Sequence, residues 1–385
     1  MAVVIPKLVA LDSSTLGNLA KDWRTMPSAK RVLDVLNGTG LSLFLTWHHI
    51  EELINHENEE VYDLRCNFLR HLKFINFLKD TDAIGNVGSR VELAELEIKG
   101  LLAAPNISMP ALIEQVRGNL GGFIIGRDLV SHNEIWWDYY RKNLAKDRMK
   151  RTAEIASLTH FRQPARSRKF RPDQYRKTFP SMGAILQHYK KTARSLAAQM
   201  KTHGDPRVRQ NADRLAHELM KESYDETVGV IKQGGSPRDV MITSYGVDES
   251  RLPPNATEDD VAFEAIFFQN LRLHARRLSL PFEDIASVAY QDKMPSWIVW
   301  REINRLTPGL KNAEAGNVND QNIAAFGPYV DYLQVDKRTN HLVGQCRSKH
   351  PLLESLFGRL FTNKDYVKLA TILEGIAQRP AVAPI

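Results

Sequence analysis

The stretch LVALDSSTL, residues 8–16, sets the pattern from which the fold of this chain can be predicted. Its four leading apolar residues, 8–11, predict a short buried β-strand that ends at Asp12. The hydroxyl-rich residues SST, 13–15, come next and are typical of a helix start. A buried strand that passes through a polar residue into a helix is typical of an α/β fold.

The same order of elements recurs in LFLTWHHIEELI, residues 43–54. The apolar run from Leu41 to Leu45 predicts a second strand, which ends at Thr46. A helix is expected from about residue 47 to about residue 78, with a break inside it. The repeated order strengthens the prediction of an α/β domain at this end of the chain.

The middle of the chain has an almost wholly helical pattern. Helices are expected over 90–103 and from Pro110, and residues 123–125 predict either a strand or a helix start. From about 131 to 304 the apolar spacing is helical. The most basic segment, 160–177, contains two prolines and lacks an apolar period, so it predicts an exposed loop.

The α/β pattern returns after Pro308. A short helix (IAAFGPYV) leads into a strand at 331–335, a last strand is expected at 342–345, and helices are expected at 351–362 and 365–377. We therefore expect one α/β domain with a parallel sheet, assembled from both chain ends. The expected parts are residues 1–110, a mainly helical insertion at 111–290, and residues 291–385.

The composition is that of an ordinary globular protein, since 43% of the 385 residues are hydrophobic and 25% are charged. The net charge of +7 is compatible with nucleic-acid binding but is not diagnostic of it. Cys66 and Cys346 form no metal-binding or disulfide pattern. No stretch reaches the roughly 18 apolar residues of a membrane span. We expect a soluble, cytoplasmic protein that does not bind membranes.

Carboxylates lie near the predicted strand ends: Asp12 after the first strand, Glu51 and Glu52 after the second, Asp320 at a predicted helix start, and Asp336 after DYLQV. Parallel sheets bind ligands outside the carboxyl ends of their strands. Carboxylates that meet there repel one another unless a cation lies between them, and oxygen ligands favour Mg²⁺ or Mn²⁺. Such an ion can orient a phosphodiester for attack by water.

The segments that carry these residues resemble the PIN-like nuclease domains, Rossmann-like α/β domains that bind divalent metal and cleave RNA, less often DNA. LVALDSSTL is similar to the family's first strand with its aspartate and a neighbouring hydroxyl residue, here Ser13 or Ser14. LFLTWHHIEELI resembles the second strand and the Glu-Leu pair that follows it, which selects Glu52. NVNDQNIAAFGPYVDYLQVDKRT, 317–339, resembles the segment in which one aspartate opens a helix and another ends the next strand.

The resemblance covers residues 1–105 and 290–350, and it implies a large family member with a helical insertion. It implies an endonuclease site that holds Mg²⁺ or Mn²⁺ and cleaves RNA in preference to DNA. The implied metal-binding and catalytic residues are Asp12, Glu52, Asp320 and Asp336. Together with the basic loop at 160–177, the expected substrate-binding residues are Ser13, Lys337, Arg338, Arg166, Arg168 and Lys169.

Each carboxylate also has a structural interpretation. Asp12 and Asp320 could cap helices, Glu52 could be a solvated helix residue, and Asp336 could lie in a turn. Asp331 is separated from Asp336 by an odd number of positions, so the two face opposite sides of a regular strand. We therefore expect Asp331 to be structural or to support the metal ligands from behind. The same supporting role is expected for Thr46.

Two other functions are compatible with the sequence. In the first, the α/β part is an inactive nuclease fold, and the helical insertion binds RNA, a protein partner or a second copy of the chain. Purified protein that cleaves no nucleic acid in Mn²⁺ would favour it. The second, a nucleotide-binding or small-molecule enzyme, is less favoured because neither GxGxxG nor GxxxxGK[ST] is present.

Overall fold

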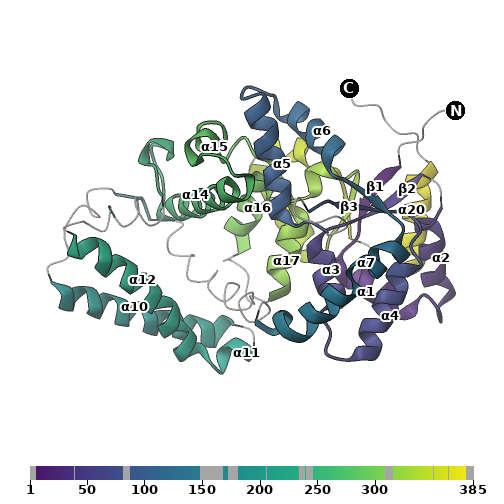
Figure 1. Cartoon of the computed structure of the whole chain (residues 1–385), viewed down its shortest axis with the longest axis horizontal. Coiled ribbons are helices and arrows are strands. Elements are labelled where there is room, and N and C mark those ends of the chain that lie inside the picture. The colour runs from purple at the N-terminus through teal and green to yellow at the C-terminus, as the bar shows by residue number, and fades with distance from the viewer. Residues whose placement is uncertain are drawn as a thin grey trace. The chain divides into compact units, whose positions relative to one another are not determined.

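The computed structural model of the chain describes residues 6–38, 40–80, 87–147, 168–171, 181–204, 206–233, 239, 246–307, 315–349, 351–362 and 364–378. The chain divides into two compact units, whose elements are labelled in Figure 1. Unit 1 comprises Met1–Lys146, Asp292–Ile303 and Asn319–Ile385. Unit 2 comprises Asp147–Gln291 and Asn304–Val318.

Unit 1 is built on a six-stranded sheet with the strand order β4-β3-β2-β1-β5-β6. The strands are β1 (Lys7–Ala10), β2 (Leu41–Leu45), β3 (Ile75–Leu78), β4 (Gly121–Ile124), β5 (Tyr332–Gln334) and β6 (Arg359–Phe361). Neighbouring strands are parallel except for β4, which runs antiparallel to β3. The expected α/β fold assembled from both chain ends is confirmed, but the sheet is mixed and not wholly parallel.

Helices flank this sheet. They are α1 (Ser13–Asp22), α2 (Pro27–Leu36), α3 (Trp47–Ile54), α4 (Glu59–Arg70), α5 (Arg90–Ala103), α6 (Met109–Asn119), α7 (Gly126–Tyr139), α18 (Lys337–Lys349), α19 (Pro351–Leu356) and α20 (Tyr366–Gln378). A π-helical turn (Tyr140–Leu144) continues α7, and a 3₁₀ turn, η6 (Gly327–Tyr329), precedes β5. Two further helices, α16 (Pro295–Leu306) and α17 (Ala315–Ala324), run across the boundary between the units.

Several expected elements are wrong. The helix expected to reach about residue 78 ends at Arg70, and the apolar run INFL forms β3 because Ile75 pairs with Leu43 of β2. Residues 342–345, expected to form a strand, lie inside α18. The helix expected over 351–362 ends at Leu356 and is followed by β6. The expected boundary at residue 110 is also too early, because β4 and α7 pack in unit 1.

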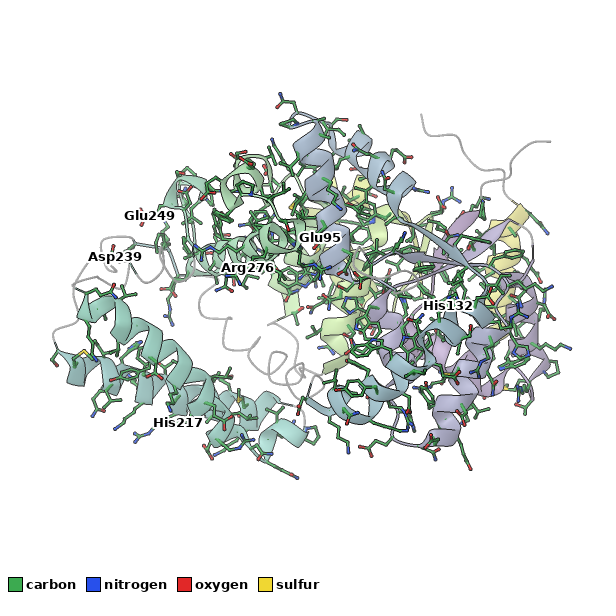
Figure 2. All side chains as sticks on the ribbon, in the orientation of Figure 1. Glu95, His132, His217, Asp239, Glu249 and Arg276 are labelled. Atoms are coloured by element: carbon green, nitrogen blue, oxygen red, sulfur yellow. The ribbon has the colours of Figure 1, made fainter. Side chains whose placement is uncertain are left out.

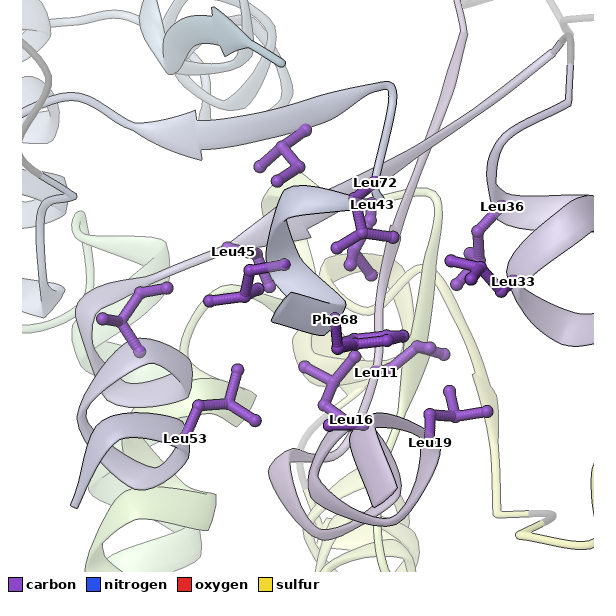
Figure 3. Close-up of a cluster of buried hydrophobic side chains, with 14 of the residues drawn as sticks. Leu11, Leu16, Leu19, Leu33, Leu36, Leu43, Leu45, Leu53, Phe68 and Leu72 are labelled. Atoms are coloured by element: carbon purple, nitrogen blue, oxygen red, sulfur yellow. The ribbon is translucent and has the colours of Figure 1, made fainter. Parts of the chain in front are cut away.

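The main hydrophobic core lies between the sheet and helices α1, α2, α4, α7 and α20. Figure 3 shows part of it, where leucines of β2, α1 and α2 surround the ring of Phe68. Phe68, Leu11 and Leu16 are completely buried. This packing fixes the sheet edge at which β1 and β2 end, and therefore the positions of the polar residues that follow them.

The described part of unit 2 is helical, as the sequence predicts. Its helices are α10 (Met182–His203), α11 (Pro206–Arg209), α12 (Ala212–Lys232), α14 (Glu258–Leu278) and α15 (Phe282–Val288), with a 3₁₀ turn at Glu249–Arg251. Helices α10 and α12 share a small core that includes Met200 and Leu215. Within the described ranges, no helix combines the length and apolar character needed to cross a membrane.

Candidate functional site

The strand order creates a switch point between β1 and β5. From β1 the chain builds the sheet in one direction through β2 and β3, whereas β5 and β6 extend it on the other side. Open α/β sheets bind ligands in the crevice outside the carboxyl ends of the strands at such a point. Asp12 follows β1 and Asp336 follows β5, so the two aspartates flank this position.

Asp12 is held rigidly at the end of β1. Its Oδ1 accepts hydrogen bonds from the backbone N–H of Ser14 at 2.8 Å and of Thr15 at 3.3 Å, which caps α1. The backbone N–H of Asp12 donates to Oε1 of Gln334, the last residue of β5, at 3.2 Å. The side chain is only 6% exposed. The capping interpretation of Asp12 is therefore confirmed, and it leaves Oδ2 outside the cap.

Asp336 occupies the equivalent place after β5. Its Oδ1 accepts a 2.6 Å hydrogen bond from the backbone N–H of Thr339 in the first turn of α18. It lines a pocket of about 610 Å³ together with Lys337, Thr362 and Lys364. Both aspartates thus cap a helix and stand at the same edge of the sheet.

The two adjacent glutamates of α3 make different side-chain contacts. Glu52 accepts a 2.8 Å hydrogen bond from Nδ2 of Asn319, the residue before Asp320. Glu51 instead accepts a 2.6 Å hydrogen bond from the hydroxyl of Tyr140. Burial raises the pKa of Glu52, hydrogen bonds from Asn319 and Ser13 lower it, and the charge of Asp12 raises it.

Asp320 brings the fourth carboxylate to the same place. Burial raises the pKa of Asp320 well above its usual range, and the charges of Glu52, Asp336 and Asp12 raise it further. Asp12, Glu52 and Asp336 therefore all act on the charge of Asp320. Asp320 does not open a helix, as the sequence suggested, because α17 already begins at Ala315.

Lys364 is a cation of the site that the sequence did not reveal. Its Nζ lies 3.2 Å from Oδ2 of Asp12 and donates a 2.6 Å hydrogen bond to Oγ of Ser14. It also lowers the pKa of Asp320. A lysine that closely follows a strand end would have been the signal, but the three-residue strand β6 was not predicted. Asn319 and Gln334 were missed for a similar reason, since amides carry no charge pattern.

The residues expected to support the site separate into two groups. Thr46 is fully buried at the end of β2, and its backbone N–H donates to Nδ1 of His49 at 3.0 Å. Burial lowers the pKa of His49 to about 4, so this histidine is neutral at pH 7. Asp331 lies at the opposite end of β5, where its carboxylate accepts hydrogen bonds from the backbone N–H of Leu8 and from the guanidinium group of Arg117, both at 2.8 Å. Asp331 is structural and does not reach the acidic cluster.

Only some of the basic residues expected to bind substrate lie in unit 1. Lys337 is exposed beside Asp336, and Arg338 is the next residue of α18. Arg168 and Lys169 belong to unit 2, where Lys169 forms a β-bridge with Thr257 and Arg168 is 3.6 Å from Glu258. Arg166 lies outside the described residues.

The donor chemistry of Asp12, Glu52, Asp320 and Asp336 fits a hard divalent cation, because all four side chains offer carboxylate oxygens. A bound cation would also offset the repulsion between these carboxylates. Among the described residues, however, no three His, Cys, Asp or Glu side chains are placed so that they could hold one metal ion as they stand. Binding would therefore require the carboxylates to rotate toward a common point and Lys364 to leave Oδ2 of Asp12.

Comparisons of the chain with protein-family models, with curated proteins and with solved structures gave no match. The assignment of a function therefore depends on the geometry and charge of this site.

A second buried acid, Glu97, lies on α5 between the side chains of α16 and η6. Figure 2 labels its neighbour on the same helix, Glu95, and both are completely buried. The Glu97 carboxylate accepts hydrogen bonds from the backbone N–H and the hydroxyl of Ser296, at 2.7 and 2.8 Å, and from the hydroxyl of Tyr329. Burial raises the pKa of Glu97 to about 7, although these hydrogen bonds and Arg90 oppose the rise.

Glu97→Gln is expected to flatten the dependence of stability on pH. Because its pKa is raised in the folded state, the native protein binds the proton more tightly than the unfolded chain. Stability is therefore lost as the pH rises from about 4.5 to about 7, by roughly 3 kcal/mol for this group. Urea unfolding at pH 5, 6, 7 and 8 measures the effect. An equal loss of unfolding free energy in wild type and variant would contradict the assignment.

Proposed function

We propose that this protein is a metal-dependent nuclease that cleaves phosphodiester bonds, with RNA preferred over DNA, at the carboxyl edge of its sheet. The observation that carries the proposal is that Asp12 and Asp336 follow β1 and β5 at the switch point, while Glu52 is hydrogen-bonded to Asn319, the neighbour of Asp320. Mutual repulsion among the buried Asp12 and the partly buried Glu52, Asp320 and Asp336 disfavours folding, so a ligand that compensates it is expected. The PIN-like assignment is part of this proposal and adds the preference for RNA.

The four acids would hold Mg²⁺ or Mn²⁺, which when bound supplies positive charge for the phosphate and activates water. The chain's own residues prepare this site. The backbone N–H groups of α1 and α18 orient Asp12 and Asp336, and Asn319 orients Glu52. Lys337 and Lys364 line the adjoining pocket with Asp336, where their ammonium groups can bind phosphate oxygens.

A cleavage assay tests the proposal. Purified protein is incubated with 5′-labelled single-stranded RNA and DNA of the same sequence, in Mg²⁺, in Mn²⁺, in Ca²⁺ and in EDTA. Cleavage in Mg²⁺ or Mn²⁺ that stops in EDTA, with RNA cut faster than DNA, supports it. Equal cleavage in EDTA would contradict the metal dependence, and faster cleavage of DNA would contradict only the substrate preference.

One observation favours the alternative of an inactive binding scaffold. Lys364 already places its ammonium group against Asp12 and so neutralises part of the cluster without a metal. If the protein binds RNA but cleaves neither nucleic acid in Mn²⁺, while Lys364→Gln does not create activity, the scaffold is the better account.

A further inference from the structure

A larger cavity lies away from the acidic cluster, at the amino-terminal edge of β5 and β6. Its volume is about 1130 Å³, and its walls come from α6, η6, α18, α19 and the start of β6. Asp331, which precedes β5, lines it, whereas Asp336 follows the same strand. The two sites are therefore at opposite ends of β5. The volume is slightly above the usual range of small-molecule sites, about 300–1000 Å³.

One wall of this cavity is apolar. Leu356 and Phe357 of the α19 region are buried, and Leu352 on the same helix is 57% exposed. Met109 and Ile113 of α6 also line the cavity. An exposed leucine beside a hollow lined by buried apolar side chains offers a surface from which an apolar ligand chain can displace water.

Three guanidinium groups also line the cavity. Arg117 is paired with Asp331 at 2.8 Å, and Arg359 donates to the hydroxyl of Tyr332 at 3.3 Å. Arg347 lies over the ring of Phe357, 5.5 Å from its centroid, and its Nε is buried without a hydrogen-bond partner among the described residues. A buried N–H that lacks a partner is costly, so a ligand oxygen at this position would be favourable.

The charged side chains that line the cavity are those of Arg117, Arg347, Arg359, Glu114 and Asp331, which leaves one positive charge in excess. Asp331 uses one oxygen for Arg117 and the other for the backbone N–H of Leu8, so its charge is already compensated. The first turn of α6 adds the positive end of an 11-residue helix to the same cavity. Arginine is suited to a planar carboxylate because its N–H groups can bind both oxygens.

We infer that this cavity is a second ligand site, which binds a small organic acid with an apolar chain. The carboxylate lies against Arg347, and the chain lies over Leu352, Leu356 and Phe357. This inference does not rest on the proposed nuclease activity, because no residue of the acidic cluster lines the cavity.

Isothermal titration calorimetry of the full chain with octanoate tests it. Octanoate is expected to bind one site with a Kd between about 10 μM and 1 mM, an affinity that a ligand with so few non-hydrogen atoms can reach. Octan-1-ol, which lacks the charge, and acetate, which lacks the chain, are each expected to bind at least about tenfold more weakly.

Variants locate the binding. Arg347→Gln and Leu352→Asn are each expected to weaken octanoate binding at least about tenfold. Leu352 is exposed, so its variant remains folded even if Arg347→Gln does not. Arg127→Gln is the matched control, because Arg127 is 75% exposed on α7 and does not line the cavity. The inference would be overturned if octanoate did not bind at concentrations up to about 10 mM, ten times the upper end of the expected Kd range. Equal binding of octan-1-ol, or unchanged octanoate binding by Leu352→Asn, would also overturn it.

Discussion

Asp336→Asn is expected to lower the rate of RNA cleavage at least about 100-fold without unfolding the protein, and Asp12→Asn is expected to do the same. Each variant loses a negatively charged metal ligand. Each also keeps a side-chain oxygen that can cap its helix, since Asp336 accepts from the N–H of Thr339 and Asp12 from that of Ser14. Asparagine caps helices about as well as aspartate. Each substitution is therefore expected to lower the cleavage rate while the protein keeps its stability.

Asp331→Asn is the matched control for this result. It lies five positions before Asp336 but at the opposite end of β5, paired with Arg117. Its variant is expected to keep the wild-type cleavage rate and to lose at most about 1 kcal/mol of stability, because the ion pair is partly exposed. Single-turnover rates with labelled RNA and thermal unfolding measure both quantities. Full activity in both Asp12→Asn and Asp336→Asn would refute the proposed mechanism.

Asp320→Asn is expected to stabilise the metal-free protein and to remove most of its response to Mn²⁺. The pKa of Asp320 is raised by burial and by Glu52, Asp336 and Asp12. A carboxyl with a raised pKa loses stability as the pH rises through that pKa, because its charged form is then repelled by the neighbouring carboxylates. Asparagine removes one of these charges.

Thermal unfolding at pH 8 with EDTA or with Mn²⁺ measures this effect. Saturating Mn²⁺, at about 100 times its Kd, is expected to stabilise wild type by about 2.7 kcal/mol and so raise its Tm by several degrees. In EDTA the variant is expected to have the higher Tm, and Mn²⁺ is expected to change it little. A variant that melts below wild type in EDTA would show that Asp320 is instead held by favourable contacts.

The sequence was sufficient for the strands that carry the acids. The runs LVAL, LSLFL and DYLQV were predicted as strands, and each is followed by a polar residue that caps or enters a helix. The order Asp, Glu, Asp, Asp along the chain led to Asp12 and Asp336, which follow the neighbouring strands β1 and β5, and to Glu52 and Asp320, which interact by charge. Glu52 was chosen over Glu51 by resemblance alone, and Glu51 is hydrogen-bonded to Tyr140.

The missed features depend on contacts distant in the sequence. INFL and RLF were assigned to helices from the sequence, and they form strands because they pair with β2 and β5, respectively. Without β6, nothing marked Lys364 as a neighbour of Asp12, 352 positions away. The different roles of Asp331 and Asp336 could be assigned only from the structure. Asp331 is held at the far end of β5 by its hydrogen bonds from Leu8 and Arg117.

Anomalous diffraction from crystals soaked in Mn²⁺ is the most direct test of the acidic site. The proposed function predicts a peak at the carboxyl edge of β1 and β5, with carboxylate oxygens of Asp12, Asp320 and Asp336 at about 2.0–2.2 Å and Lys364 moved off Asp12. No peak at this edge, with the four acids in place and Lys364 still paired with Asp12, would contradict it.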